Sequence, residues 1–227
     1  MNKNKNSSQG RWASATDYTY HVLKKQIING TLSPNQPIVE QTLSTELEVS
    51  RTPLREAIQR LEYEDLLTRK ANGRLKVSTI SIKDVEEIFI VRSKLEAVAV
   101  EQAIDNMTEE DEKKLSHLTF MIEEMSKQKV IEEVVNYGEQ FHKYIYQLSN
   151  NQTVIKILLQ LKNHIDRYRR LAPSKEGKPR TVVNEHQLIL DYMIEGNKDK
   201  AKKAMETHII KSMNSIVEKI KANSQLQ

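Results

Sequence analysis

The polar side chains best placed to do chemistry lie in one amphipathic segment, VSRTPLREAIQRLE (residues 49–62). Leu54, Ile58 and Leu61 are spaced by three and four residues, so they share one face of a helix. The polar side of that helix has Arg51, Thr52, Arg55 and Gln59. Arginine can pair bidentately with guanine O6 and N7, so this pattern is typical of a helix that reads the DNA major groove. A solvated basic face on an ordinary helix is the alternative.

A second group consists of three histidines on segments with helical periodicity, His142, His186 and His208. Converging imidazoles that leave an open coordination position suit Zn²⁺ or a neighbouring ion such as Ni²⁺. Scattered histidines are more often surface or satisfied core residues, so spacing alone does not select a metal site. The same three histidines leave a second function open, that of a helical metal-dependent hydrolase. Such an enzyme would also need a general base near the metal, and Glu139 or Glu185 could provide it.

Three arginines on the same predicted helices could bind an anionic effector, because guanidinium pairs bidentately with carboxylate. They are Arg92, Arg167 and Arg170. Arg92 is also spaced to pair with Glu96 one helical turn later, which would be a purely structural contact. Arg167 and Arg170 equally fit a solvated helix end before the loop predicted over residues 174–180.

The polar residues of segment 49–62 must be positioned by the elements around them. The sequence predicts these elements in the order helix, helix, turn, helix and hairpin. Residues 16–29 have a helical stripe that Gly30 closes, and residues 31–39 contain two prolines and must be a turn or extended. A short helix then precedes the amphipathic one. Asn72 and Gly73 separate two short segments, and this dipeptide tolerates the positive φ of a hairpin turn. The first domain is therefore predicted to be a winged helix-turn-helix with three helices and a two-stranded wing.

The rest of the chain favours helices and lacks strand-length alternation, so the second domain is predicted to be an all-α bundle and the fold mainly α. We predict a flexible tail over residues 1–12, a DNA-binding domain over 13–78 and a ligand-binding and dimerisation domain over 79–227. The helices predicted in the last of these are 82–105, 108–128, 130–149, 152–171, 181–195 and 198–222.

Charge and composition narrow the class of protein. The formal net charge of +4 lies entirely in residues 1–80, as expected for a part that binds a polyanion, and the remainder is neutral. The absence of cysteine excludes disulfides and thiolate chemistry, and no apolar run reaches membrane-spanning length. The start is not a secretory signal, so we expect a cytoplasmic protein.

Catalytic signatures such as a P-loop or H-E-x-x-H are missing, so we expect that the protein is not an enzyme. A purely structural helical dimer is a further alternative, but it would leave the arginines of segment 49–62 unexplained.

The stretch from Val22 to Val77 resembles the winged-helix domain of GntR-type bacterial transcription regulators. The resemblance rests on Ile28-Asn29-Gly30, Leu32-Ser33-Pro34, Glu40, Leu43, Val49 to Ala57 and Leu61-Glu62. It implies that Arg51, Thr52 and Arg55 contact operator DNA. Gln41 stands where some members have a DNA-contacting arginine, and Asn72 with Gly73 forms the wing tip.

Residues 81–96, SIKDVEEIFIVRSKLE, are similar to the start of the effector domain in the FadR subgroup, the FCD-type domain. That likeness implies a dimer and a site for a metal or small ligand at His142, His186 and His208. Metal-binding members have an Asp one helical turn before the first histidine, where this chain has Gly138. The site could bind metal through three histidines plus effector or water, bind it weakly, or use the imidazoles to bind an organic effector directly.

Together these features predict a dimeric repressor that binds an inverted-repeat operator in double-stranded DNA. A small-molecule effector, an organic acid, would modulate its operator affinity.

Overall fold

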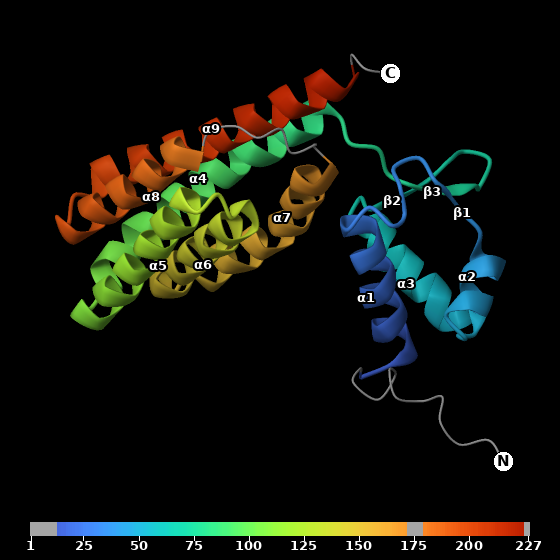
Figure 1. Cartoon of the computed structure of the whole chain (residues 1–227). Helices are drawn as coiled ribbons and strands as arrows, with labels where there is room; N and C mark the ends of the chain where they lie inside the picture. Colours follow the sequence, from blue (N-terminus) through green and yellow to red (C-terminus); the bar gives the residue numbers. More distant parts are fainter. Residues whose placement is uncertain (1–12, 172–178, 225–227) are drawn as a thin grey trace. The chain divides into compact units, whose positions relative to one another are not determined.

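The computed structural model describes residues 13–171 and 179–224, so the predicted tail over 1–12 lies outside the described residues. The described chain forms two units (Figure 1). The first extends to Ser81 and also includes Asp166–Leu171, and the second contains the rest.

The first unit contains three helices and three short strands. The helices are α1 (Ala15–Ile28), α2 (Glu40–Glu46) and α3 (Arg51–Tyr63), and the strands are β1 (Pro37–Ile38), β2 (Leu67–Arg69) and β3 (Leu75–Val77). The Ser14 side chain caps α1 by accepting from the backbone N–H of Asp17. Gly30 follows the end of α1 with a φ of 78°, which glycine adopts without a steric cost.

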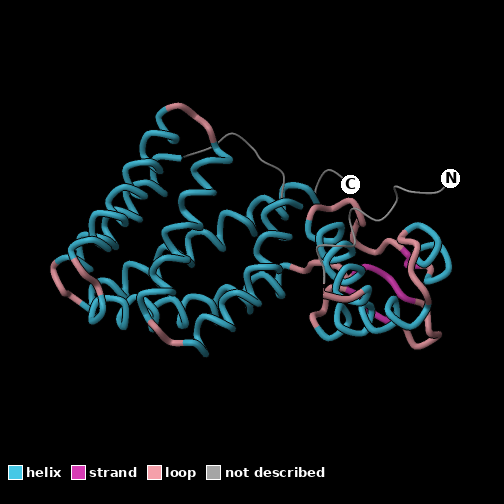
Figure 2. The backbone as a smooth tube through the Cα atoms, turned by 90° about the horizontal axis from the view of Figure 1, so that it is seen from below, coloured by secondary structure: helices cyan, strands magenta, loops and turns pink. Residues whose placement is uncertain are grey.

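The sheet has one strand more than the predicted wing. Its order is β1-β3-β2, all antiparallel, with Leu67 opposite Val77 and Ile38 opposite Leu75 (Figure 2). The expectation of a two-stranded wing was therefore incomplete, because β1 comes from the segment predicted as turn or extended. Pro37 is tolerated there because β1 is an edge strand and needs no donor on its outer side.

The predicted apolar face of α3 forms the core of this unit. Leu54, Ala57, Ile58 and Leu61 are at most 1 % exposed, and they lie in one buried cluster with Leu23 and Ile27 of α1 and Val77 of β3. Packing of this face against α1 turns the opposite, polar side of α3 outward.

The second unit is entirely helical in its described residues, as predicted. Its helices are α4 (Ile82–Asn106), α5 (Glu109–Lys127), α6 (Ile131–Ser149), α7 (Gln152–Leu171, whose last turn groups with the first unit), α8 (Pro179–Ile194) and α9 (Lys198–Ser224). Thr108 and Asp111 cap α5 reciprocally in a capping box, also as predicted. The loop predicted over 174–180 falls mostly outside the described residues. Pro179 already begins α8, two residues before the predicted start, because proline is tolerated at the first helical position.

The bundle packs α4 against α9 and α6, and α8 against α9 and α5 (Figure 1). This arrangement brings residues from α4, α6, α8 and α9 into one interior. Among the described helices, none is both long and apolar enough to cross a membrane.

Candidate DNA-binding surface and histidine cluster

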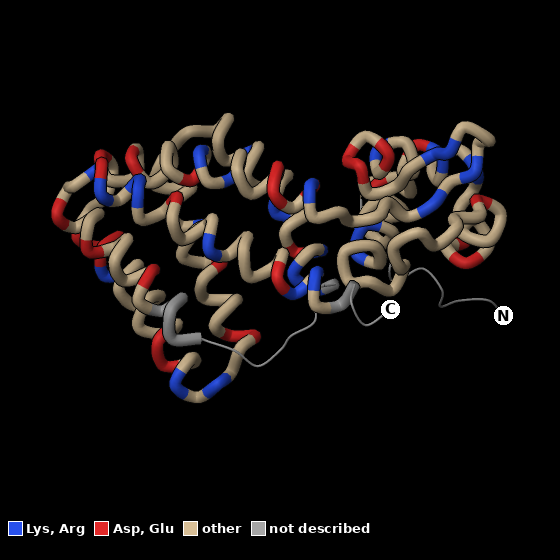
Figure 3. Tube along the Cα trace, turned by 90° about the horizontal axis from the view of Figure 1, so that it is seen from above, with Lys and Arg blue, Asp and Glu red and all other residues tan. Residues whose placement is uncertain are grey.

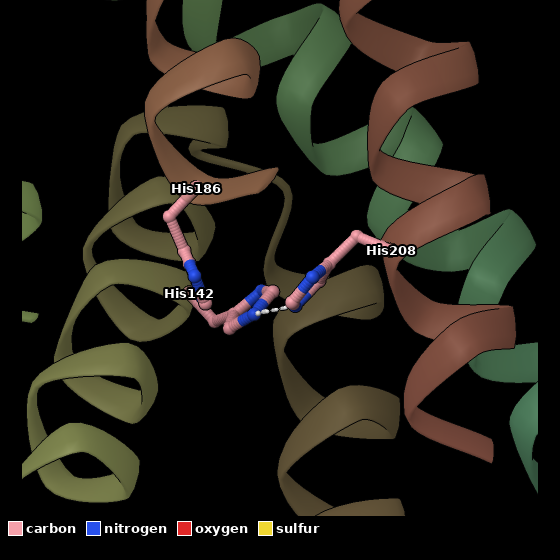
Figure 4. Close-up of side chains that lie close together, drawn as sticks. All are labelled: His142, His186 and His208. Atoms are coloured by element: carbon pink, nitrogen blue, oxygen red, sulfur yellow. Dashed lines mark hydrogen bonds between the residues drawn. The ribbon is translucent and has the colours of Figure 1, made fainter. Parts of the chain in front are cut away.

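The bundle brings the three predicted histidines together, although 66 residues separate the first from the last. His142 comes from α6, His186 from α8 and His208 from α9, and all three are buried (Figure 4). Each offers one ring nitrogen such that the three atoms lie within 4.8 Å of one another.

Two carboxylates fix the orientation of the rings. His142 Nδ1 lies 2.6 Å from Glu96 Oε2, and His208 Nδ1 lies 2.9 Å from Glu185 Oε2. Because an ionised carboxylate only accepts, each Nδ1 must carry a proton, and in a neutral imidazole this leaves Nε2 with a lone pair. This carboxylate–histidine arrangement is the one that orients imidazoles around metals in other proteins.

The two Nε2 atoms of His142 and His208 then face each other at 3.1 Å. Two lone pairs at that distance repel unless a proton or a cation lies between them. Ligands at about 2.0–2.1 Å from a tetrahedral Zn²⁺ are about 3.3 Å apart. The cluster therefore fits a divalent metal with three imidazole ligands.

Gly138 lies one turn before His142 on α6 and faces the same cluster. A Cβ built on Gly138 would be 3.5 Å from His186 Nε2, in ordinary contact. A side chain at this position would thus point at the histidines, and glycine leaves that direction open.

A buried ionic network supports the cluster from α4. The Glu96 carboxylate is fully buried; it accepts from Arg92 Nε, the Tyr146 hydroxyl and His142 Nδ1, each at 2.6 Å. Burial alone would raise the pKa of Glu96, but the attraction of Arg92 and its hydrogen bonds outweigh burial and hold the pKa well below the usual range. The same contacts keep the pKa of Arg92 above its usual value, against the effect of its own burial.

Burial has the opposite outcome at His142. It lowers the pKa of His142 to about 4, and the nearby Glu96 only partly offsets this effect. His142 is therefore neutral at pH 7, the form in which imidazole binds a metal. Burial raises the pKa of Glu185, but hydrogen bonds from His208 and Lys211 outweigh it, so that pKa is lowered too.

The three candidate effector arginines are divided between the two units. Arg92 is in the second unit and is engaged with Glu96, although its Nη1 has no hydrogen-bond partner among the described residues. Arg167 and Arg170 belong to the segment that groups with the first unit. Arg167 is buried and donates to the backbone carbonyl of Ser78, whereas Arg170 is exposed.

The candidate DNA-binding residues all lie on the exposed surface of the first unit. On α3 these are Arg51, Thr52, Arg55 and Gln59. Gln41, on α2, accepts from Arg51 Nη2 at 3.1 Å, so the structure joins two of the candidates. Asn72 and Gly73 form the turn between β2 and β3, where Asn72 Oδ1 accepts from the backbone N–H of Arg74 and Gly73 has a φ of 79°.

Acidic positions are interspersed with basic ones along the backbone of the first unit (Figure 3). Glu40 Oε2 accepts from Arg55 Nε at 3.0 Å, and Glu62 accepts from Arg69 Nε and Nη2, both at 3.0 Å. Sequence reasoning missed these partners, and it missed Glu96 and Glu185 as partners of the histidines. Glu96 carried a signal: it follows Phe89 by seven residues and Arg92 by four, on the buried face of α4.

Two family models match the chain. Residues 15–77 match the model for bacterial regulatory proteins of the gntR family, and residues 87–211 match the FCD domain. The chain is 32 % identical over 195 residues to the uncharacterized HTH-type transcriptional regulator YdhC of Bacillus subtilis, covering 83 % of this chain and 85 % of that protein. It is 23 % identical over 201 residues to the HTH-type transcriptional repressor RspR of Escherichia coli, covering 87 % of this chain and 86 % of that protein.

Solved structures share the fold. McbR/YncC of E. coli matches with a TM-score of 0.71 and 22 % identity over 91 % of this chain and 99 % of that one. The metal-free FCD domain of TM0439 matches with a TM-score of 0.55 and 20 % identity over 64 % of this chain and 99 % of that one. The family and these relatives are transcription regulators, which confirms that the chain is not an enzyme and sets the hydrolase alternative aside.

Proposed function

We propose that this chain, which belongs to the gntR family of bacterial regulatory proteins and carries an FCD domain, is a repressor whose operator affinity responds to a small molecule. One observation carries the DNA-binding part of the proposal. Arg51, Thr52 and Arg55 are exposed at the N-terminal half of α3, the second helix of the helix-turn-helix. That half of the second helix is the part that meets bases and phosphates in the major groove.

The remaining candidates would extend this contact. Gln41 and Gln59 would add polar contacts beside the arginines, and Asn72 with Gly73 would bring the wing tip to the backbone or the minor groove. Two copies of the chain would bind the two halves of an inverted repeat, because operator symmetry mirrors that of a homodimer. A regulator of chromosomal DNA would work in the cytoplasm.

For the second unit we propose a site for a divalent metal, Zn²⁺ or Ni²⁺, held by His142, His186 and His208. Two observations support this proposal. His142 is neutral, and carboxylates bind the Nδ1 atoms of His142 and His208, which leaves their Nε2 atoms facing the cluster. A metal held there supplies a Lewis-acidic position for the carboxylate of an organic acid. Since Gly138 offers no ligand, the coordination position that three imidazoles leave on a tetrahedral ion would be open to effector or water.

Arg92 is the effector arginine that we retain, because it pairs with Glu96 beside the histidines and its buried Nη1 has no hydrogen-bond partner among the described residues. Arg167 also has a buried donor, Nε, without a partner among the described residues, but it donates through Nη2 to Ser78 and, like Arg170, lies in the segment that groups with the first unit and not with the histidines. Effector binding would change operator affinity by about 5- to 150-fold, the usual range of allosteric coupling.

The DNA-binding proposal is tested with Arg55→Ala. The probe is a duplex selected in vitro from a random-sequence library by the wild-type protein, and fluorescence anisotropy measures its affinity. Loss of a bidentate base contact should weaken binding by about 5- to 150-fold. Lys25→Ala, which removes the same charge from an exposed position on α1, is the matched control and should change affinity little. Equal effects of the two variants would contradict the proposal.

The metal proposal is tested on protein purified without a His-tag. Elemental analysis should find about one metal per chain. His208→Ala should lose it, whereas His117→Ala, at an exposed position on α5, should keep it. The proposal fails if the protein holds no metal and added Zn²⁺ leaves its melting temperature unchanged.

A further inference from the structure

Four charged residues of the first unit alternate in sign from one element to the next. We call them the charge ladder: Arg55, Glu40, Arg69 and Glu62. Arg55 on α3 pairs with Glu40 on α2 at 3.0 Å, and Arg69 Nη1 on β2 lies 3.9 Å from the other oxygen of Glu40. Arg69 pairs in turn with Glu62, near the end of α3, at 3.0 Å. The ladder thus links α3, α2 and the wing.

The two arginines in the ladder use their donors differently. Arg69 gives Nε and Nη2 to Glu62, and its Nη1 donates to the Gly73 carbonyl at the wing tip. Among the described residues, Arg55 donates only from Nε, to Glu40. Guanidinium is a rigid planar fork, so a carboxylate at Nε fixes its plane and leaves both terminal nitrogens for another partner. Guanine recognition uses a bidentate pair of that kind.

Stability does not account for the pairing of Glu40 with Arg55. The Arg55 side chain is 66 % exposed, and ion pairs this exposed contribute little to folding. A carboxylate on a surface that binds DNA also repels phosphates, so Glu40 lowers the affinity for any DNA. Its geometry gives it a compensating use, because an arginine held in one orientation loses less side-chain entropy when it meets a base.

We propose that Glu40 is a positioning residue that determines operator specificity: it holds Arg55 at Nε with both terminal nitrogens available for a base edge, and it ties Arg55 to the wing through Arg69. This proposal rests on the proposed function, since it requires that Arg55 reads DNA. It assigns Glu40 a role that its charge alone would not predict.

The test is Glu40→Gln against Glu46→Gln. Glu46 is an exposed residue of the same helix, so both variants lose one negative charge from α2. Each is titrated with the duplex selected from a random library and with a scrambled duplex of equal length. Glu46→Gln should strengthen binding to both duplexes alike or leave both unchanged. Glu40→Gln should bind the scrambled duplex at least as well as the wild type does but lose at least about fivefold in its preference for the selected duplex.

A second readout separates positioning from a general disturbance. Duplexes with single base-pair changes should show that Glu40→Gln and Arg55→Ala lose discrimination at the same base pair. In the double variant the two losses should not add, because both act through one contact. Glu40→Asp, which keeps the carboxylate, should restore part of the preference, and circular dichroism should show that every variant is folded.

The proposal is overturned if Glu40→Gln keeps its preference for the selected duplex, or if the losses fall at different base pairs. A variant that does not fold would also overturn it, since Glu40 would then be structural. Failure of the proposed function looks different: the wild-type protein would select no duplex, or Arg55→Ala would bind as the wild type does.

Discussion

The two units of this protein use ion pairs in opposite ways. In the first unit, Arg55 and Glu40 form a pair whose side chains are 66 % and 30 % exposed. In the second, Arg92 and Glu96 form a pair that is 7 % and 0 % exposed, with a histidine and a tyrosine attached to the same carboxylate. An exposed arginine can exchange its partner for DNA at little cost, whereas a buried network keeps its geometry because breaking it leaves a charge in a poorly solvating interior.

This contrast suits the two proposed tasks. A surface that reads DNA needs arginines that are oriented but still available. A site that holds a metal needs imidazoles kept neutral and fixed in direction, and Glu96 fixes His142 from inside the core.

The largest effect is expected from Glu96→Gln. The substitution leaves the buried guanidinium of Arg92 without its counter-ion, which should lower the free energy of unfolding by about 3–5 kcal/mol in urea titrations. Glu101→Gln is the control on the same helix. Glu101 pairs with Lys202 at the surface, so its loss should cost no more than about 1 kcal/mol. Similar losses in both variants would mean that burial does not determine how much an ion pair contributes to stability in the second unit.

The next effect concerns pH. In chelator-treated protein the pKa of His142 is about 4 when folded, against a usual value of 6.5. Between about pH 6.5 and pH 4, His142 is protonated in the unfolded chain but stays neutral in the folded protein. The free energy of unfolding should therefore fall by roughly 3 kcal/mol as the pH is lowered over this range. The depressed pKa of Glu96 acts in the same direction at lower pH.

Urea titrations at several pH values measure this slope. His142→Gln should remove most of it, and the exposed His117→Gln should not. If His142→Gln retains the wild-type slope between pH 6.5 and pH 4, the stability change does not come from the buried network.

A smaller effect is expected from completing the histidine cluster. Gly138→Asp places a carboxylate beside His186, and Zn²⁺ affinity measured by competition with a chelator should increase by about 10- to 100-fold. Gly138→Asn has nearly the same shape without the charge and should give a much smaller gain. Equal affinities of the two variants would mean that position 138 does not reach the metal.

The smallest effect is expected for stability at the charge ladder. Glu40→Gln should change the free energy of unfolding by no more than about 1 kcal/mol, because its partners are exposed. Urea titration beside the wild type measures this difference. A loss near that of Glu96→Gln would show that the first unit also depends on its ion pairs for folding.

Local patterns predicted most of the fold. The spacing of Leu54, Ala57, Ile58 and Leu61 is a property of one segment, and the structure buries those residues as expected. The capping box of Thr108 and Asp111 is equally local. Strand β1 was not predicted as a strand, because two residues become a strand only by pairing with Leu75 and Lys76, far along the chain.

The site was harder to predict for the same reason. Spacings of 44 and 22 residues do not show that three histidines converge, and from the sequence only the resemblance to a family grouped them. The pair of Arg92 and Glu96 was visible as an i, i+4 pair, for which a few tenths of a kcal/mol is usual at a surface. The bundle leaves that pair only 7 % and 0 % exposed, so its energetic importance comes from tertiary packing.

Arg69 has a consequence for the entropy of association. Its guanidinium joins the end of α3 to the wing tip through Glu62 and the Gly73 carbonyl, so the hairpin is already restrained before DNA arrives. Ordering a free side chain at an interface costs about 0.5–1.5 kcal/mol, and a loose loop costs more. A wing restrained in this way loses little conformational entropy when it contacts the duplex. The first unit is therefore preorganised for binding DNA.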